Sequence, residues 1–265
     1  MYSALKLAQK YIRYHFTSSN GKGHGVHSPF VFDFISNVLN DKRNFYAYAH
    51  IENLRNQLLT DASMINVEDF GAGSSVTKSD QRKVCDITKH AAKNKKFAQL
   101  LFRISNYYQP KTMIELGTSL GISSAYLASG NTNATLITIE GSPEIAAIAK
   151  KNISSLGLKN IRFITGNFDD ELNDVLKKNP SVDLVFIDGN HRKEPTLKYF
   201  DQLLEHADDS SIFIFDDIHW SKEMEHAWEH IKQSAEVTLT IDLFFIGLVF
   251  FRKEIKVKQD FVIRF

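Results

Sequence analysis

From residue 111 onward, short apolar segments alternate with segments that carry a helical pattern. Seven apolar segments are expected to form strands, at 112–116, 135–140, 161–165, 182–187, 211–215, 237–243 and 246–252. Apolar strands separated by helices are typical of a parallel sheet that is covered on both faces. Two residues join the last two strands, which should therefore pair antiparallel. The pattern predicts an α/β fold with a doubly wound, mostly parallel seven-stranded sheet and an antiparallel last strand.

The first of these strands ends in a glycine turn. Residues 113–121 read Met-Ile-Glu-Leu-Gly-Thr-Ser-Leu-Gly, and a helix opens directly afterwards. Gly117 allows the chain to turn and a ligand to approach the backbone closely. The free N–H groups at the start of the helix give this end a partial positive charge that can face a bound ligand. The Gly-x-x-x-Gly spacing differs from the fingerprint that cradles a pyrophosphate, so the turn alone does not identify its ligand.

Polar side chains follow five consecutive strands of the predicted sheet. They are Glu115, Glu140, Asn167 after Gly166, Asp188, and Asp216 with Asp217. In open α/β sheets, ligands bind beyond the carboxyl ends of the strands. Glu140 lies 23 residues after Gly117, about the distance at which a carboxylate reaches a ribose diol. The series therefore predicts one ligand site along this edge.

Residues 1–96 are expected to form a helical extension in front of a core domain at 97–265. Its first helix, over residues 2–16, is basic and amphipathic. The apolar side of that helix holds Leu5, Ala8, Ile12 and Phe16. The rest of the extension should contain a glycine- and histidine-rich loop at 21–29, helices from Pro29 and over 46–60, and a glycine-rich turn or hairpin at 69–74.

Charge and cysteine content indicate which partners and which cellular compartment to expect. Residues 1–110 carry a net charge of +7 and the whole chain +1. A basic segment can indicate an anionic partner, but it more often reflects solvated helix faces, so a nucleic acid is disfavoured. The single Cys85 excludes an internal disulfide and suits a reducing compartment. The longest strongly apolar run, 243–251, is too short to span a bilayer. These features predict a cytoplasmic protein without a membrane partner.

The chain from about residue 97 to 252 resembles a class I S-adenosylmethionine-dependent methyltransferase with a Rossmann-like sheet. It is most similar to small-molecule O-methyltransferases of the catechol and caffeoyl-CoA kind, whose first motif residues 115–123 resemble. The resemblance implies that the Ser123 hydroxyl holds the methionine carboxylate, that Glu140 binds the ribose, and that Asn167 contacts adenine where the family often has Asp. The implied cofactor-binding residues are Glu115, Gly117, Thr118, Ser119, Gly121, Ser123, Glu140, Gly141, Gly166, Asn167, Phe168 and Asp188.

The resemblance also extends to a metal site. Asp188 matches an acid that binds a divalent metal in the catechol type, and Asp216 and Asp217 match the next two ligands, an Asp and an Asn in the family. Three carboxylates close together repel one another unless a cation or a proton is present, and oxygen ligands suit Mg²⁺. The alternative is that Asp216 caps the following helix and Asp217 is solvated.

Three histidine patterns need interpretation. His191 stands where the catechol type has its catalytic lysine, and it would either remove a hydroxyl proton or only order its loop. His219 would either line the substrate pocket or belong to a loop. The sequence His-Ala-Trp-Glu-His at 226–230 fits a zinc-protease pattern, but it falls on a helix of a fold with a different site, so chance explains it better.

The residues favour methyl transfer to a small-molecule acceptor, most simply to a hydroxyl oxygen, with His191 as base and Asp188 orienting the acceptor or a metal. An RNA or protein methyltransferase is one alternative. Enzymes that methylate amino groups of nucleic acids usually carry an Asn/Asp-Pro-Pro-aromatic motif at the end of the fourth strand, and this sequence contains no Pro-Pro pair. A catalytically silent cofactor-binding regulator is another, and a nicotinamide dehydrogenase is a third that the glycine spacing disfavours. A homodimer is compatible with the sequence.

Overall fold

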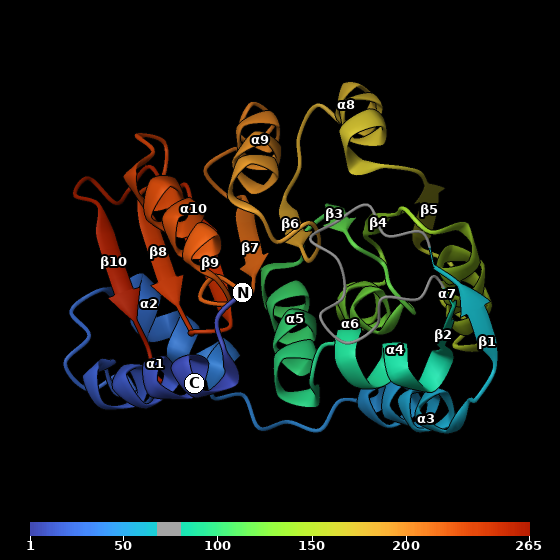
Figure 1. The fold of residues 1–265 in the computed structure, drawn as a ribbon. Coiled ribbons are helices and arrows are strands. Elements are labelled where there is room, and N and C mark those ends of the chain that lie inside the picture. The colour runs from blue at the N-terminus through green and yellow to red at the C-terminus, as the bar shows by residue number, and fades with distance from the viewer. Residues whose placement is uncertain (68–80) are drawn as a thin grey trace. The chain divides into compact units, whose positions relative to one another are not determined.

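The computed structural model describes residues 1–67 and 81–265. The chain divides into two compact units, shown together in Figure 1. The terminal unit combines Met1–Asp41 with Pro180–Phe265, and the middle unit is Lys42–Asn179. The predicted glycine-rich turn at 69–74 lies outside the described residues. The expected boundary between an extension and a core domain, after residue 96, stays a prediction.

The middle unit consists of helices and two sets of strands. Its helices are α3 (Tyr46–Thr60), α4 (Val84–Ala91), α5 (Lys95–Tyr108), α6 (Ile122–Gly130), α7 (Pro143–Ser155) and α8 (Phe168–Lys178). Strands β3 (Thr112–Leu116), β4 (Thr135–Glu140) and β5 (Ile161–Thr165) pair parallel in chain order, so their carboxyl ends lie along one edge. Strands β1 (Met64–Asn66) and β2 (Gln81–Lys83) pair antiparallel.

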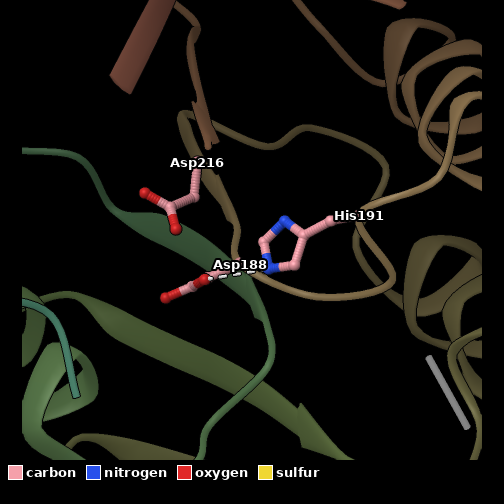
Figure 2. Close-up of side chains that lie close together, drawn as sticks. All are labelled: Asp188, His191 and Asp216. Carbon is pink, nitrogen blue, oxygen red and sulfur yellow. Dashed lines mark ion pairs between the residues drawn. The ribbon is translucent and has the colours of Figure 1, made fainter. Parts of the chain in front are cut away.

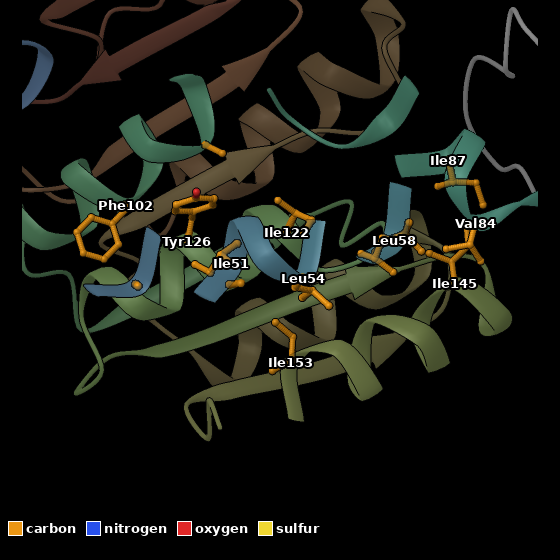
Figure 3. Packing of buried hydrophobic residues seen from close by; sticks show 14 of the residues in the cluster. Ile51, Leu54, Leu58, Val84, Ile87, Phe102, Ile122, Tyr126, Ile145 and Ile153 are labelled. Carbon is orange, nitrogen blue, oxygen red and sulfur yellow. The ribbon is translucent and has the colours of Figure 1, made fainter. Parts of the chain in front are cut away.

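Apolar side chains from α3, α4, α5, α6 and α7 form the core of this unit (Figure 3). Every residue of α6 is buried, which explains why this helix carries small and apolar residues on all sides. One polar link crosses the cluster, where the Tyr126 hydroxyl donates to Glu52 Oε1 over 2.7 Å. The helix that follows the glycine turn is therefore held rigidly from all sides.

The terminal unit contains the two ends of the chain. Its helical segments are α1 (Ala4–Thr17), α2 (Pro29–Phe34), the π-helix η1 (Ile35–Leu39), α9 (Lys193–Leu204) and α10 (Lys222–Gln233). Its strands are β6 (Leu184–Ile187), β7 (Ile212–Asp216), β8 (Leu239–Asp242), β9 (Ile246–Phe250) and β10 (Gln259–Val262), in the spatial order β10-β8-β9-β7-β6. Strand β6 is parallel to β7, β9 is antiparallel to both neighbours, and β10 is parallel to β8.

The predicted α/β class with mostly parallel strands is confirmed, and all seven predicted strands are present. The predicted antiparallel pairing of 237–243 with 246–252 is also confirmed. The expected strand count is wrong by one, because β10 adds an eighth strand and the last strand of the chain is therefore parallel to its neighbour. Strand β10 has no fully buried residue, so its sequence lacks the apolar pattern of the other strands.

The helices of the N-terminal segment also follow the sequence. Helix α2 begins at Pro29 behind the extended residue Ser28, as expected for proline at the first helical position. Helices α1 and α3 lie within a residue or two of their predicted ranges. Among the helices that the structure describes, none combines the length and the apolarity needed to cross a bilayer.

Candidate active site

The glycine turn after β3 contains three residues in the left-handed region. Gly117, Ser119 and Gly121 have φ angles of +103°, +48° and +86°. The N–H of Gly117 donates to the Ile139 carbonyl over 3.0 Å, which ties the turn to the end of β4. Side chains are rarely tolerated at such φ angles, so the sequence places glycine at two of the three positions.

Glu140 is the residue that fixes this turn. Its Oε2 accepts the backbone N–H of Ser119 over 2.9 Å, and its Oε1 accepts the N–H of Ser142 over 3.0 Å. One carboxylate thus joins the glycine turn to the start of α7. A carboxylate offers about four acceptor positions, so a group of this kind can accept hydroxyl donors as well as backbone N–H groups.

Glu115, predicted as a cofactor contact, lies inside the protein with no exposed surface. Its Oε2 accepts the Thr138 hydroxyl over 2.7 Å and also accepts the Ser124 hydroxyl. The Thr118 hydroxyl lies 2.6 Å from that of Thr138, so a chain of hydroxyl groups leads from the turn to this carboxyl group. Burial raises the pKa of Glu115 to about 7, although the hydroxyl donors partly offset the effect.

This raised pKa leads to a prediction for folding stability. Between pH 4.5 and about 7 the folded protein holds the Glu115 proton more tightly than the unfolded chain does. The free energy of unfolding should therefore decrease as pH rises through this window, by about 2–3 kcal/mol from this group. Urea unfolding measured against pH should show this decrease in the wild type and lose it in Glu115→Gln, because an amide stays neutral. Glu144→Gln serves as the control, because Glu144 is exposed and hydrogen-bonds the exposed Asn66. If the free energy of unfolding changed equally with pH in the wild type and in Glu115→Gln, the prediction would be contradicted.

The predicted adenine turn, Gly166-Asn167-Phe168, joins β5 to α8. The N–H of Gly166 donates to the Glu140 carbonyl over 2.9 Å. Asn167 caps α8, because its Oδ1 accepts the N–H of Asp169 over 3.1 Å. A side chain at Gly166 would meet Glu171 at 2.7 Å, so glycine keeps this turn open. The cap uses the carbonyl oxygen of Asn167, so its amide nitrogen is the donor that it can direct at a ligand.

An acid–histidine cluster lies at the carboxyl ends of two parallel strands in the terminal unit. Asp188 follows β6, Asp216 ends β7, and His191 lies in the loop before α9. Figure 2 shows the three side chains converging, with His191 Nε2 3.7 Å from Asp188 Oδ1. One ligand atom from each residue lies within 4.8 Å of the other two. This spacing suits a divalent cation or a hydroxyl group whose proton is being removed.

Asp217 directly follows Asp216 at the end of β7. Its φ angle is +55°, its N–H donates to the Phe245 carbonyl over 2.7 Å, and its own carbonyl accepts the N–H of Trp220 over 2.9 Å. The chain therefore turns at this residue. Among the described residues, Asp188, His191 and Asp216 form a group that could hold a metal ion, and the expected role of Asp217 as a metal ligand stays a prediction.

The loop that carries His191 is held by its neighbours. Asn190 adopts a φ of +51°, its amide donates to the Tyr199 hydroxyl over 3.2 Å, and its carbonyl oxygen accepts Arg192 Nε over 2.8 Å. The His191 ring lies 5.6 Å from the Trp220 ring, centroid to centroid. Because Asn190 makes the hydrogen bonds that shape the loop, His191 is available for another role.

His219 lies between two carboxylates. Its Nε2 is 2.7 Å from Asp242 Oδ2, and its Nδ1 is 3.1 Å from Glu225 Oε1. Glu225 also accepts from Lys10 and from the Tyr2 hydroxyl, both over 2.7 Å. Burial lowers the pKa of His219, but the two carboxylates outweigh it and leave the pKa above its ordinary value. The structure thus places His219 in an ion-pair network that anchors α1, which the sequence did not indicate.

Comparison with known proteins agrees with this geometry. Residues 114–218 match the family model described as a methyltransferase domain. This part of the chain is thus similar to a methyltransferase domain, which confirms the resemblance predicted from the sequence. It is 33% identical over 126 residues to a catechol O-methyltransferase of Niastella koreensis, a match that covers 46% of this chain and 55% of that protein. The chain thus spans about half the length of the curated relatives it matches.

Solved structures share the fold at low identity. An S-adenosylhomocysteine-bound methyltransferase of Podospora anserina is 14% identical with a TM-score of 0.59, over 85% of this chain and 97% of that one. An O-methyltransferase of Bacillus cereus in complex with S-adenosylhomocysteine is 18% identical with a TM-score of 0.55, over 83% and 97%. At these identities the likeness establishes the methyltransferase fold, and the predicted fold class is confirmed.

Proposed function

We propose that this protein transfers the methyl group of S-adenosylmethionine to a hydroxyl oxygen of a small-molecule acceptor. The observation that carries the proposal is the Glu140 carboxylate, which is locked by two backbone N–H groups beside the left-handed glycine turn. The catechol O-methyltransferase of Niastella koreensis supports the choice of acceptor, a hydroxylated small molecule such as a catechol. The proposal assigns the acceptor chemistry to the cluster of Asp188, His191 and Asp216.

S-Adenosylmethionine supplies a methyl group that its sulfonium already activates for transfer. Glu140 accepts the ribose hydroxyls, the Ser123 hydroxyl binds the methionine carboxylate, and the Asn167 amide donates to the adenine edge. Glu115 and Thr118 contribute indirectly, because both side chains are fully buried. Through their hydrogen bonds with Thr138 they hold β3 and the glycine turn in position. The remaining contacts of the proposed site are Gly117, Ser119, Gly121, Gly141, Gly166, Phe168 and Asp188.

His191 is the proposed base. It removes the proton from the acceptor hydroxyl, and the carboxylate of Asp188, 3.7 Å from Nε2, attracts the positive charge that the imidazole gains. Asp188 also orients the acceptor. The protein thus aligns the acceptor with the methyl group and removes the acceptor's hydroxyl proton. No further activation is needed, because the methyl donor is already activated.

A divalent cation fits the same cluster. Asp188 and Asp216 provide carboxylate oxygens that suit Mg²⁺, and Asp217 is the third ligand that the family pattern implies. The observed cluster also brings the His191 nitrogen close. A bound cation would stabilise the negative charge on the deprotonated hydroxyl oxygen of the acceptor. The residues proposed for the metal are therefore Asp188, Asp216 and Asp217.

The test is calorimetric titration of cofactor-free protein with S-adenosylmethionine, with and without Mg²⁺. Glu140→Ala should weaken binding by about ten-fold or more, because it removes the ribose acceptor and releases the N–H groups of Ser119 and Ser142. Glu144→Ala is the matched control, since Glu144 lies four residues further on, is exposed, and accepts hydrogen bonds from the exposed Asn66.

Two results would contradict the proposal. One is a wild-type protein that does not bind S-adenosylmethionine at all, and the other is a Glu140→Ala variant that binds as tightly as Glu144→Ala. Binding should then be followed by assays with catechols and other hydroxylated acceptors, with the methylated product identified by mass spectrometry. Binding without turnover on any acceptor would favour the silent regulatory protein.

The setting of the protein is part of the proposal. The free thiol of Cys85 agrees with the reducing cytoplasm that the sequence predicts. A small-molecule acceptor is the proposed partner, a nucleic acid is not proposed, and a homodimer stays a prediction. Light scattering of the purified protein measures the oligomeric state directly.

A further inference from the structure

Helix α1 packs on the rest of the terminal unit with one face only. Tyr14 is buried, its hydroxyl donates to the Ile263 carbonyl, and it accepts the N–H of Phe265 over 3.1 Å. Tyr11 contacts the Phe244 ring edge-on at 5.1 Å between centroids. Lys10 forms an ion pair with Glu225 on the same side. These contacts fix the rotation of α1 about its axis.

The opposite face of α1 is apolar and uncovered. Leu5, Ile12 and Phe16 are 72%, 56% and 78% exposed, and Ala8 between them is also exposed. Positions i, i+3, i+7 and i+11 fall on one stripe of a helix. This is the apolar side that the sequence predicts for residues 2–16, and a core-facing helix would bury it. Single exposed apolar residues are ordinary, but a continuous stripe of large ones marks an interaction surface.

The charged side chains that α1 itself carries are all positive. Lys6 and Arg13 lie exposed on α1 beside it, and helix α1 contains no acidic residue. Residues 1–32 hold four Lys or Arg residues and no Asp or Glu. At the end of the helix, the N–H of Arg264 donates to the Ser19 carbonyl over 3.0 Å, which brings another exposed cationic residue there.

We propose that α1 docks the protein on an anionic lipid membrane, with the Leu5–Phe16 stripe in the headgroup region and Lys6 and Arg13 at lipid phosphates. An amphipathic helix with large apolar residues on one face and Lys and Arg beside them lies flat in such an interface. A second copy of the chain fits less well, because two apposed α1 helices bring together cations without any acid on either helix.

This surface differs from the site proposed for methyl transfer and does not depend on it. The sequence-based expectation of no membrane partner rested on the absence of a segment long enough to span a bilayer. That argument does not apply to a helix that lies in the interface and is held to the protein by its other face. The proposal therefore replaces the expectation with a peripheral membrane association.

Co-sedimentation of the full chain with vesicles tests the proposal. Vesicles of phosphatidylcholine with about one third phosphatidylglycerol should bind the protein, and phosphatidylcholine alone should bind it much more weakly. Ile12→Ser with Phe16→Ser should reduce binding about ten-fold or more, because it removes the apolar stripe at unchanged charge. Val257→Ser is the matched control, since Val257 is 76% exposed but lies outside α1.

Charge is tested separately. Lys6→Gln with Arg13→Gln should weaken binding to anionic vesicles and reduce its sensitivity to salt. All substituted positions are exposed, so circular dichroism should show unchanged helix content. A wild-type protein that stays in the supernatant with anionic vesicles would overturn the proposal. So would a dimer in light scattering that Ile12→Ser with Phe16→Ser dissociates, since the stripe would then be an interface between copies.

Discussion

Replacing His191 by alanine is expected to reduce the turnover of methyl transfer by about 100- to 10,000-fold, the usual range for loss of a general base. His191 lies with Asp188 and Asp216 at the ends of β6 and β7, where an acceptor hydroxyl can reach its ring. The Michaelis constant for S-adenosylmethionine should change little, because His191 itself is not among the proposed cofactor contacts. Steady-state kinetics with both substrates varied would separate the two effects.

Added imidazole should restore part of the activity of His191→Ala, because a free base can enter the space that the side chain leaves. His230→Ala is the matched control, since this exposed histidine near the end of α10 is outside the site, and it should keep full activity. If His191→Ala retained more than about half of the wild-type turnover, the proposed base would be wrong. Loss of activity in Asp188→Asn alone would then assign the chemistry to the carboxylates.

The second large effect is expected at Gly130, the last residue of α6. An alanine Cβ there would lie 2.6 Å from Ser105 Cβ and 2.7 Å from the Phe102 carbonyl oxygen on α5. A backbone oxygen cannot swing aside as a flexible side chain can, so the two helices must separate. Gly130→Ala should therefore lower the free energy of unfolding by about 2–3 kcal/mol, the cost of overpacking a close contact. Urea unfolding followed by circular dichroism measures this change.

Gly157→Ala is the control that separates packing from backbone conformation. Gly157 has a φ of +72°, and no heavy atom lies within 4 Å of its added Cβ. Its replacement should cost only the conformational penalty of a left-handed residue, about 1 kcal/mol. If Gly130→Ala proved no more destabilising than Gly157→Ala, the close approach of α5 and α6 would not be a constraint on the sequence.

Local signals in the sequence located most elements of the fold. Apolar runs placed β3, β4 and β5 at their observed residues, and Ser142 with Pro143 marked the start of α7. Strand β10 was missed because its residues alternate between half-buried and exposed, and its polar positions resemble a loop. An edge strand is stabilised by pairing with β8, and that pairing leaves no apolar run in the sequence.

The candidate site was predictable wherever a residue ends a strand. Asp188 and Asp216 meet because β6 and β7 are parallel neighbours, and consecutive strands joined by a helix are commonly adjacent in a sheet. Glu140 was found in the same way. The metal role expected for Asp217 stays a prediction, and its left-handed turn with a hydrogen bond to Phe245 was not visible in the sequence.

The sequence by itself determined the fold class, the strand ends, the glycine turn and the identity of the acids along them, because these depend on periodicity and spacing within short segments. Tertiary structure decided which side chains face each other: it buried Glu115 among hydroxyl groups, enclosed His219 between Glu225 and Asp242, and left the apolar side of α1 exposed. Burial and charge pairing depend on segments far apart in the chain, so no local pattern specifies them.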